Sequence, residues 1–313
     1  MEKIAVIGAG AIGRAWAIVF ARAAHPVALY SRSDSTLSTA AELISASVDS
    51  LREFGLLEEA PDAVKGRISM LTQLEAALDG AGYVQENIPE ALAEKQALFA
   101  RLDELAGPEV ILASSTSTIP TSSFAGGVKG KHRCVVAHPV NPPYLVPAVE
   151  ISPAPFTAHE TVARTTDLLV SVGQVPIVMK REIQGFVMNR LQSLLACEAV
   201  RLVEGGYASP EDVDRAVRDG LGLRWSFMGP LETLDLNAPG GFKQFAQVFA
   251  PIMHAIDASP EATPRAWSGE VVRKIDAERR SRVPLSEQAA RVLWRDRRLM
   301  ALIAHKRAIE TRA

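Results

Sequence analysis

His138 and Glu150, twelve positions apart, could together carry acid–base chemistry. His138 directly follows the apolar run Cys134–Ala137, which is typical of a buried strand, and Glu150 belongs to the next predicted strand. Histidine changes its charge near neutral pH, and a carboxylate on one ring nitrogen fixes its tautomer. The spacing therefore permits a His138–Glu150 dyad. A structural histidine at a strand end is the competing interpretation, and spacing alone does not decide between the two.

Ser117 and Asn189 are two further polar side chains that could hold a reacting oxygen. Ser117 follows the predicted strand Val110–Ala113, although a run of Ser and Thr after a strand often forms only a turn or a helix cap. Asn189 lies on a mostly apolar predicted helix, where a buried amide requires a hydrogen-bond partner. That partner is either a ligand or nearby backbone, and the residues leave both open.

A glycine-rich turn near the N-terminus predicts a phosphate-binding site. The apolar strand Ile4–Ile7 leads into G-x-G-x-x-G, and a helix follows from Arg14. In such turns Gly8 permits the tight turn, Gly10 lets the backbone approach a pyrophosphate, and Gly13 lets the helix pack closely on the strand. The unpaired N–H groups at the start of the helix favour the phosphates. The residues expected to contact a dinucleotide here are Gly8, Gly10, Ala11, Ile12 and Gly13.

The residues after the second predicted strand, Pro26–Tyr30, favour NADP over NAD. An NAD site usually has Asp or Glu here to bind the ribose 2′-hydroxyl, but this chain has Ser31. The missing carboxylate removes a charge that would repel a 2′-phosphate, and Arg32 could pair with that phosphate. Asp34 comes three positions too late to replace the acid. If Arg32 is an ordinary solvated loop residue, NAD binds instead.

The chain divides into a part in which strands and helices alternate and a part with helical periodicity alone. The first part, residues 1–183, predicts an α/β domain of the Rossmann type with a doubly wound, mainly parallel sheet. The second part, residues 184–313, predicts an all-helical domain. Its first helix is strongly apolar and stops at Gly205-Gly206, and we expect it to be buried, either in the helical core or across a homodimer interface. The predicted strands are Ile4–Ile7, Pro26–Tyr30, Arg67–Leu71, Gly82–Asn87, Val110–Ala113, Cys134–Ala137, Val149–Ile151 and Ile177–Met179.

Composition narrows the classes of function. The net charge of −2 gives no reason to expect a nucleic-acid partner, and 48% apolar residues are enough for real cores in 313 residues. The two cysteines belong to no C-x-x-C pair or Cys/His cluster, so we expect neither a metal site nor a disulfide framework. The apolar runs are too short to span a bilayer. We therefore expect a soluble, cytoplasmic protein with a small-molecule substrate and no membrane partner.

Three motifs in the order Ala137–Tyr144, Gly185–Gln192 and Gly229–Thr233 resemble a known family. They read AHPVNPPY, GFVMNRLQ and GPLET, and they are similar to the lambda-crystallin / L-gulonate 3-dehydrogenase group of the L-3-hydroxyacyl-CoA dehydrogenase superfamily. The resemblance implies hydride transfer between a nicotinamide cofactor and the 3-hydroxyl group of the substrate. It extends from the first strand to about Asn237 and continues weakly to the C-terminus.

The resemblance also assigns roles to single residues. It implies His138 with Glu150 as the catalytic pair, and Ser117 with Asn189 as the groups that hold the substrate oxygen. Glu90 and Lys95 match positions near the nicotinamide. The acidic residue that the group has at the end of the second strand is absent here, which leaves its NAD preference open for this chain.

Arg224 is the residue that could distinguish a free acid from a CoA thioester as the substrate. It resembles an arginine of the lambda-crystallin group that the acyl-CoA enzymes lack, and an arginine in an apolar segment requires an anionic partner. We expect that partner to be the carboxylate of a free 3-hydroxy acid such as L-gulonate or 3-hydroxybutyrate. An internal salt bridge to Glu232 or Asp235 is the alternative. Two other functions remain: an L-3-hydroxyacyl-CoA dehydrogenase acting on thioesters, and a non-catalytic dinucleotide-binding or crystallin-like protein.

Overall fold

The computed structural model describes residues 1–259 and 267–310 in two compact units. Unit 1 comprises residues 1–189 and 292–313, and unit 2 comprises residues 190–291. The sequence predicted a division after residue 183, with the whole C-terminal stretch in the helical part. The two divisions differ mainly in the last helix, α14 (Gln288–Glu310), which from residue 292 belongs to unit 1.

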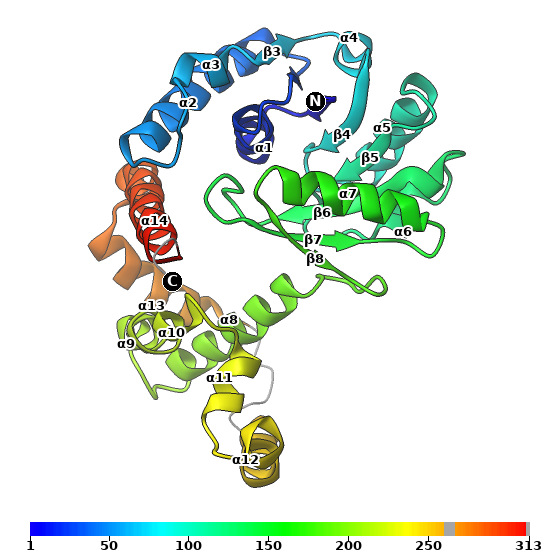
Figure 1. Ribbon diagram of the computed structural model, residues 1–313. Coiled ribbons are helices and arrows are strands. Elements are labelled where there is room, and N and C mark those ends of the chain that lie inside the picture. Colours follow the sequence, from blue (N-terminus) through cyan, green and yellow to red (C-terminus); the bar gives the residue numbers. More distant parts are fainter. Residues whose placement is uncertain (260–266, 311–313) are drawn as a thin grey trace. The chain divides into compact units, whose positions relative to one another are not determined.

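Unit 1 contains one eight-stranded sheet with strand order β3-β2-β1-β4-β5-β6-β7-β8 (Figure 1). Every neighbouring pair is parallel except β6 and β7, which are antiparallel. This confirms the predicted mainly parallel, doubly wound sheet, and each strand lies within a residue or two of its expected place. The strands are β1 (Lys3–Ile7), β2 (Val27–Tyr30), β3 (Ile68–Leu71), β4 (Ala81–Glu86), β5 (Ile111–Ser114), β6 (Cys134–Pro139), β7 (Ala148–Ser152) and β8 (Val175–Val178).

Helices cover both faces of the sheet, so successive strand residues enter two different cores. Ile4 and Val6 of β1 pack with α1 (Ala11–Arg22), α2 (Asp34–Glu53) and α7 (His159–Ser171), whereas Ala5 and Ile7 pack on the other side. The second core is covered by α4 (Leu74–Leu78), α5 (Leu92–Leu105) and α6 (Thr121–Ala125) (Figure 1). Burial on both faces explains why these strands read as continuous apolar runs. The short helix α3 (Pro61–Lys65) lies between α2 and β3 in the chain.

One helix start differs from the prediction. The sequence predicted that Pro89 opens a helix, but α5 begins at Leu92. Residues 89–91 instead form a turn, closed by a hydrogen bond from the Ala91 N–H to the Pro89 carbonyl oxygen at 2.8 Å, and Glu90 there accepts hydrogen bonds from Thr116 and Thr118. Tertiary hydrogen bonding to the next loop therefore overrides the local preference of proline for the first helical turn.

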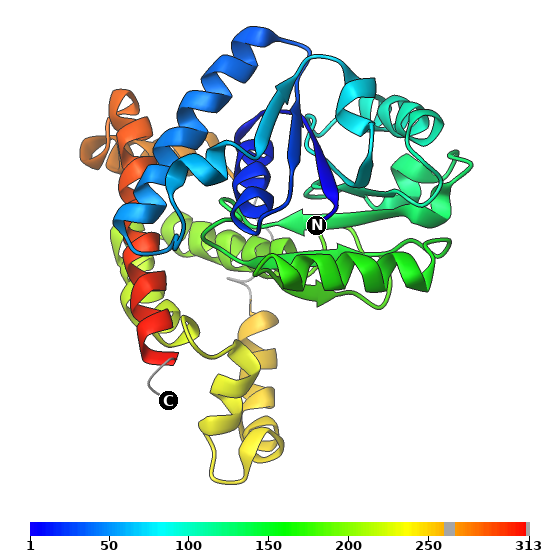
Figure 2. The ribbon, with the colours of Figure 1, turned by 45° about the horizontal axis from the view of Figure 1, so that its top comes forward.

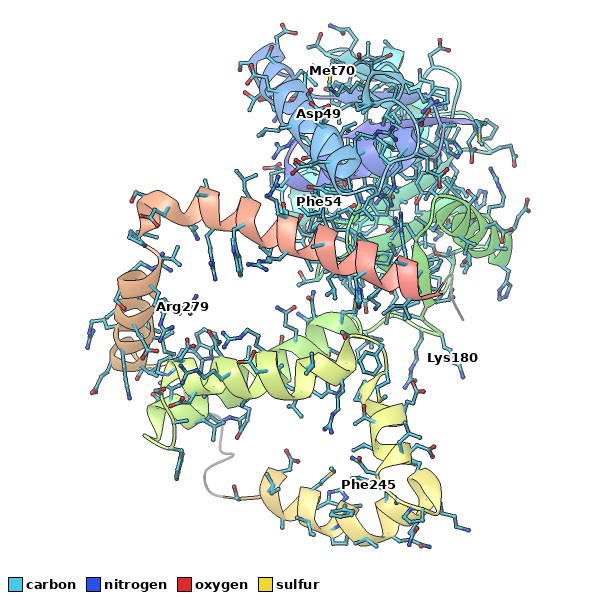
Figure 3. The ribbon with its side chains drawn as sticks, turned by 60° about the vertical axis from the view of Figure 1, so that its left-hand side comes forward. Asp49, Phe54, Met70, Lys180, Phe245 and Arg279 are labelled. Atoms are coloured by element: carbon cyan, nitrogen blue, oxygen red, sulfur yellow. The ribbon has the colours of Figure 1, made fainter. Side chains whose placement is uncertain are left out.

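Helix α14 packs on α2 within unit 1. Arg297 pairs with Glu53 at 2.6 Å, and its guanidinium lies 4.9 Å from the centroid of the Phe54 ring, which Figure 3 labels. Met300 of α14 is buried in the same core as α1 and α2. The exposed ion pair contributes little by itself, so the attachment comes mainly from burial of Met300 and of the partly buried Leu299 and Ile303, which pack on the same core.

The described residues of unit 2 form helices joined by turns and contain no strand, as predicted. Helix α8 ends at Glu204, before Gly205-Gly206, and Ser209 caps the next helix by accepting a hydrogen bond from the N–H of Asp212. Arg279, labelled in Figure 3, pairs with Asp214 at 3.2 Å. The helices, also visible in Figure 2, are α8 (Met188–Glu204), α9 (Pro210–Arg215), α10 (Gly222–Trp225), α11 (Pro230–Leu236), α12 (Gly241–Asp257) and α13 (Gly269–Arg282).

The apolar side chains of α8 are less buried than the sequence suggested. Leu191 is 57% exposed and Leu194 is 68% exposed, whereas Val203 is buried. A core formed by this chain's own helices therefore does not cover most of α8. No helix in the described ranges is both long and apolar enough to cross a membrane.

Candidate active site

The antiparallel pairing of β6 and β7 places His138 directly opposite Glu150. Side chains of directly opposed residues lie on the same face of a sheet, and here the His138 Nδ1 and Glu150 Oε2 atoms are 2.7 Å apart. Both side chains are buried. The structure thus brings together the two residues that the sequence proposed as a dyad.

The second carboxylate oxygen of Glu150 is held by backbone at the start of α8. Its Oε1 atom accepts hydrogen bonds from the N–H groups of Val187 at 2.6 Å and Met188 at 2.8 Å. The turn that presents these groups has Phe186 at φ 51°, and the Phe186 ring lies 5.5 Å from the His138 ring. A helix N-terminus favours negative charge, so this arrangement stabilises an ionised Glu150. An ionised Glu150 accepts a hydrogen bond from Nδ1–H, which leaves Nε2 of neutral His138 as a proton acceptor.

Ser117 and Asn189 also meet. The Asn189 Nδ2 atom donates to the Ser117 carbonyl oxygen at 2.7 Å, which ties the loop after β5 to the first turn of α8. Ser117 is exposed and Asn189 is half-buried. Within the described ranges, the Ser117 hydroxyl has no hydrogen-bond partner, so it is available to a ligand. One amide hydrogen of Asn189 is used by the Ser117 carbonyl oxygen. The other amide hydrogen and the amide oxygen are available to a ligand.

Glu90 organises the Ser117 loop. Its Oε1 atom accepts hydrogen bonds from the Thr116 hydroxyl at 2.6 Å, the Ser117 N–H at 3.1 Å and the Thr118 N–H at 2.9 Å. Burial opposes the charge of this carboxylate, but the hydrogen bonds from Thr116 and Thr118 and the nearby Lys95 charge outweigh it and lower the pKa of Glu90. Glu90 therefore stays ionised and fixes the backbone that carries Ser117.

Lys95 lies in a buried ion pair with Glu86, a residue that the sequence analysis did not identify. The Lys95 ammonium is 2.9 Å and 3.0 Å from the two Glu86 carboxylate oxygens, and both side chains are almost fully buried. The Ser114 hydroxyl also donates to Glu86 at 2.5 Å, and the Ile88 N–H at 2.6 Å. The charge of Lys95 is thus neutralised by a residue of the protein itself. The sequence could have indicated this pair, because Glu86 ends a mostly apolar strand and stands nine positions before Lys95.

The glycine turn has the geometry that a dinucleotide site requires. Gly8 has φ 103°, and a Cβ there would lie 2.8 Å from the Asn87 carbonyl oxygen. A Cβ on Gly13 would lie 1.8 Å from the Gly8 carbonyl oxygen, so only glycine permits this approach of α1 to β1. A Cβ on Gly10 would meet nothing within 4 Å, which leaves open space beside the first turn of α1, where Ala11 and Ile12 lie. These residues fit the pyrophosphate of a dinucleotide.

The end of β2 has no carboxylate. Ser31 accepts a hydrogen bond from the Ser33 N–H at 3.3 Å, and Ser33 caps α2. Arg32 is exposed and forms no salt bridge with any residue that the structure describes. Its guanidinium is therefore available to a ligand.

Arg224 lies on α10 in unit 2 and is exposed. Within the described part of the chain it forms no salt bridge to Glu232 or Asp235, and Asp235 instead accepts the Phe242 N–H at 2.7 Å. The internal salt bridge considered from the sequence is therefore not formed.

The Rossmann-type fold, the glycine turn and the buried His–Glu pair define a nicotinamide-dependent dehydrogenase. The NAD-binding domain of 3-hydroxyacyl-CoA dehydrogenase matches residues 3–183, and the C-terminal domain of the same family matches residues 185–283. The chain belongs to the 3-hydroxyacyl-CoA dehydrogenase family, whose members are NAD-dependent oxidoreductases that act on CH–OH groups.

Known relatives differ in what they act on. The chain is 40% identical to the lambda-crystallin homolog of Rattus norvegicus, over 96% of this chain and 94% of that protein. It is 36% identical to an L-carnitine dehydrogenase of Streptomyces coelicolor, over 80% and 78% of the two chains. Among solved structures, an NAD⁺-dependent 5-dehydrogenase of 5-formyl-3-hydroxy-2-methylpyridine 4-carboxylic acid aligns with a TM-score of 0.73 at 29% identity, covering 90% of this chain and 96% of that one.

Proposed function

We propose that this protein oxidises the 3-hydroxyl group of a small free 3-hydroxy acid, and reduces the corresponding 3-oxo acid, with NADP or NAD. The observation that carries the proposal is the buried 2.7 Å contact between His138 and Glu150, with Ser117 and Asn189 joined at the same edge of the sheet. In open α/β sheets ligands bind beyond the carboxyl ends of the strands, where these residues lie.

In this proposal, one pair of side chains transfers the proton and a second pair binds the substrate oxygen. In oxidation, Nε2 of neutral His138 takes the proton of the substrate hydroxyl, and ionised Glu150 stabilises the imidazolium that results. The Ser117 hydroxyl and the Asn189 amide hold the substrate oxygen as its charge changes. A nicotinamide bound at the glycine turn would supply the acceptor for the hydride that leaves C3. In reduction His138 donates the proton to the same oxygen.

The free acid is favoured over a CoA thioester on two grounds. The names of two relatives specify substrates that are not CoA thioesters, namely L-carnitine and a pyridine carboxylic acid. In addition, Arg224 is exposed and forms no salt bridge in the described part of the chain, so its guanidinium can bind a carboxylate. A dehydrogenase of 3-hydroxyacyl-CoA thioesters is the second candidate, since the family model that matches the chain bears that name.

The cofactor preference is proposed from Ser31 and Arg32. No carboxylate stands at the end of β2 to repel a 2′-phosphate, and the exposed Arg32 can pair with one. These features support NADP, whereas the family's NAD-binding domain supports NAD, so a direct comparison of the two cofactors is required.

We also propose that the protein is a homodimer formed through unit 2. Leu194 and Leu231 are each 68% exposed, and Phe227 is 69% exposed. Val203, Phe245 and Val271 are the buried large apolar side chains among the described residues of this unit. So large an apolar surface requires a partner, and a second copy of the same helices supplies one.

The first test is an oxidation assay with NAD and NADP in parallel, using L-gulonate, L-3-hydroxybutyrate and L-3-hydroxybutyryl-CoA. Turnover of a free acid, fastest with NADP, is the expected result. Turnover of the thioester alone would establish the second candidate, and a clear preference for NAD would show that Arg32 is not a cofactor ligand. Arg224→Met should raise the KM of the free acid, and an unchanged KM would exclude the proposed role of Arg224.

A further inference from the structure

Arg14 lies beside the glycine turn. It is the fourth residue of α1, and its Nη1 atom donates a hydrogen bond to the Ala9 carbonyl oxygen at 3.2 Å. Ala9 stands between Gly8 and Gly10, so the guanidinium is folded back against the same turn whose glycines leave room for a pyrophosphate.

The Arg14 side chain has no anionic partner in the described residues. No carboxylate there lies within salt-bridge distance, and the hydrogen bond to Ala9 uses one of five guanidinium donors. Partial burial lowers the pKa of Arg14, although its interaction with Tyr144 offsets part of that effect. A partly desolvated cation without a counter-ion is costly, so a bound anion would stabilise it.

A cavity of about 410 Å³ adjoins the guanidinium. Ala11, Arg14, Asn141 and Tyr144 are among its lining residues, and α14 contributes others. The other charged side chains in the described lining are neutralised: Arg295 pairs with Asp296 at 2.7 Å, and Arg297 pairs with Glu53. Arg14 therefore gives the cavity a net positive charge beside Ala11, at the first turn of α1.

We propose that Arg14 binds the pyrophosphate of the dinucleotide and supplies the positive charge that the glycine turn itself lacks. The turn and the first turn of α1 offer only neutral N–H groups, whereas a guanidinium adds charge-assisted hydrogen bonds to phosphate. The inference rests on the dinucleotide site of the proposed function. Because the pyrophosphate is common to NAD and NADP, Arg14 strengthens the binding of both and does not select between them.

The test compares Arg14→Met with the unmodified protein in the absence of any hydroxy acid. Dissociation constants are measured for NADH and NADPH by fluorescence and for ADP-ribose, which contains the pyrophosphate but no nicotinamide, by competition. Loss of a charged hydrogen-bonding partner should raise all three constants by a similar factor, on the order of 10- to 100-fold. The affinity of the variant should also depend less on salt, since a charge contact has been removed.

Three further variants make the result specific. Arg297→Met removes another arginine that lines the cavity, one already paired with Glu53, and should leave the three constants unchanged. Arg32→Met should weaken NADPH selectively. Arg14→Lys keeps the charge but loses the planar fork, and should give intermediate constants. Equal thermal unfolding of all variants would show that the fold is retained.

Two outcomes would overturn the inference. One is an Arg14→Met protein that binds NADH and ADP-ribose like the unmodified protein. The other is an Arg14→Met protein in which only the NADPH constant rises, which would place the 2′-phosphate and not the pyrophosphate at Arg14. Failure of the proposed dehydrogenase activity is distinguishable, because the binding constants are measured without turnover.

Discussion

Glu150 constrains the chemistry more than any other single residue, because both of its oxygens have assigned partners. One oxygen is hydrogen-bonded to Nδ1 of His138, and the other accepts hydrogen bonds from the N–H groups of Val187 and Met188. Rotation of the carboxylate would break at least one of these bonds. The imidazole is therefore presented in one tautomer and one orientation, which an acid–base catalyst requires.

Replacement of His138 should abolish most of the activity without loss of cofactor. His138→Asn removes the acid–base group, and kcat should fall by a factor on the order of 10² to 10⁴. The dissociation constant of NADH should stay the same, because the glycine turn is untouched. Steady-state kinetics and NADH fluorescence check the two expectations. His132→Asn, at an exposed histidine near the start of β6, is the matched control and should retain full activity.

At the scale of elements, the β1–α1 unit distinguishes two roles for glycine. Gly13→Ala forces a Cβ against the Gly8 carbonyl oxygen, so it should destabilise the protein, and its thermal unfolding temperature should fall. Gly10→Ala meets no atom within 4 Å, so the fold should keep its stability. Its methyl group would stand where the pyrophosphate approaches, and the NADH dissociation constant should rise. Equal stability loss in both variants would contradict this distinction.

The Lys95–Glu86 pair joins α5 to the end of β4, so its loss should lower the free energy of unfolding. Lys95→Met leaves the Glu86 carboxylate buried without its counter-ion, and the free energy of unfolding should fall by about 3–5 kcal/mol. Urea unfolding followed by circular dichroism measures the change. Lys65→Met removes the exposed pair with Asp49 and should leave the unfolding midpoint nearly unchanged. Similar midpoints for the two variants would argue against a role of the buried pair.

The sequence predicted the elements well because apolar runs and turn residues determine them locally. The strands from β1 to β8 and the stop of α8 follow from such signals. The position of Glu90 and the partner of Lys95 could not be predicted in this way, because they depend on hydrogen bonds between β4, β5 and the start of α5. His138 and Glu150 are intermediate: their spacing suggested a pair, but the antiparallel register of β6 and β7 decides it.

At the scale of the whole molecule, the two units differ in how well they bury their own apolar residues. Unit 1 has two large cores, one on each face of the sheet. In unit 2, Leu191, Leu194 and Leu195 form an exposed stripe at helical spacing along α8. Figure 3 labels Phe245 of α12, which is buried and stacks on Phe249 at 4.7 Å, while Phe249 itself is 40% exposed.

This difference predicts the oligomeric state and the substitution that changes it. Light scattering coupled to size-exclusion chromatography should give twice the chain mass of 33.7 kDa. Leu194→Glu places a charge in the exposed stripe and should shift the protein towards the monomer, because burying an unpaired charge in an interface is costly. Val170→Glu, at a valine of α7 that is 57% exposed in unit 1, is the matched control and should remain dimeric. A monomeric mass for the unmodified protein at micromolar concentration would mean that the apolar surface of unit 2 is covered by something other than a second copy.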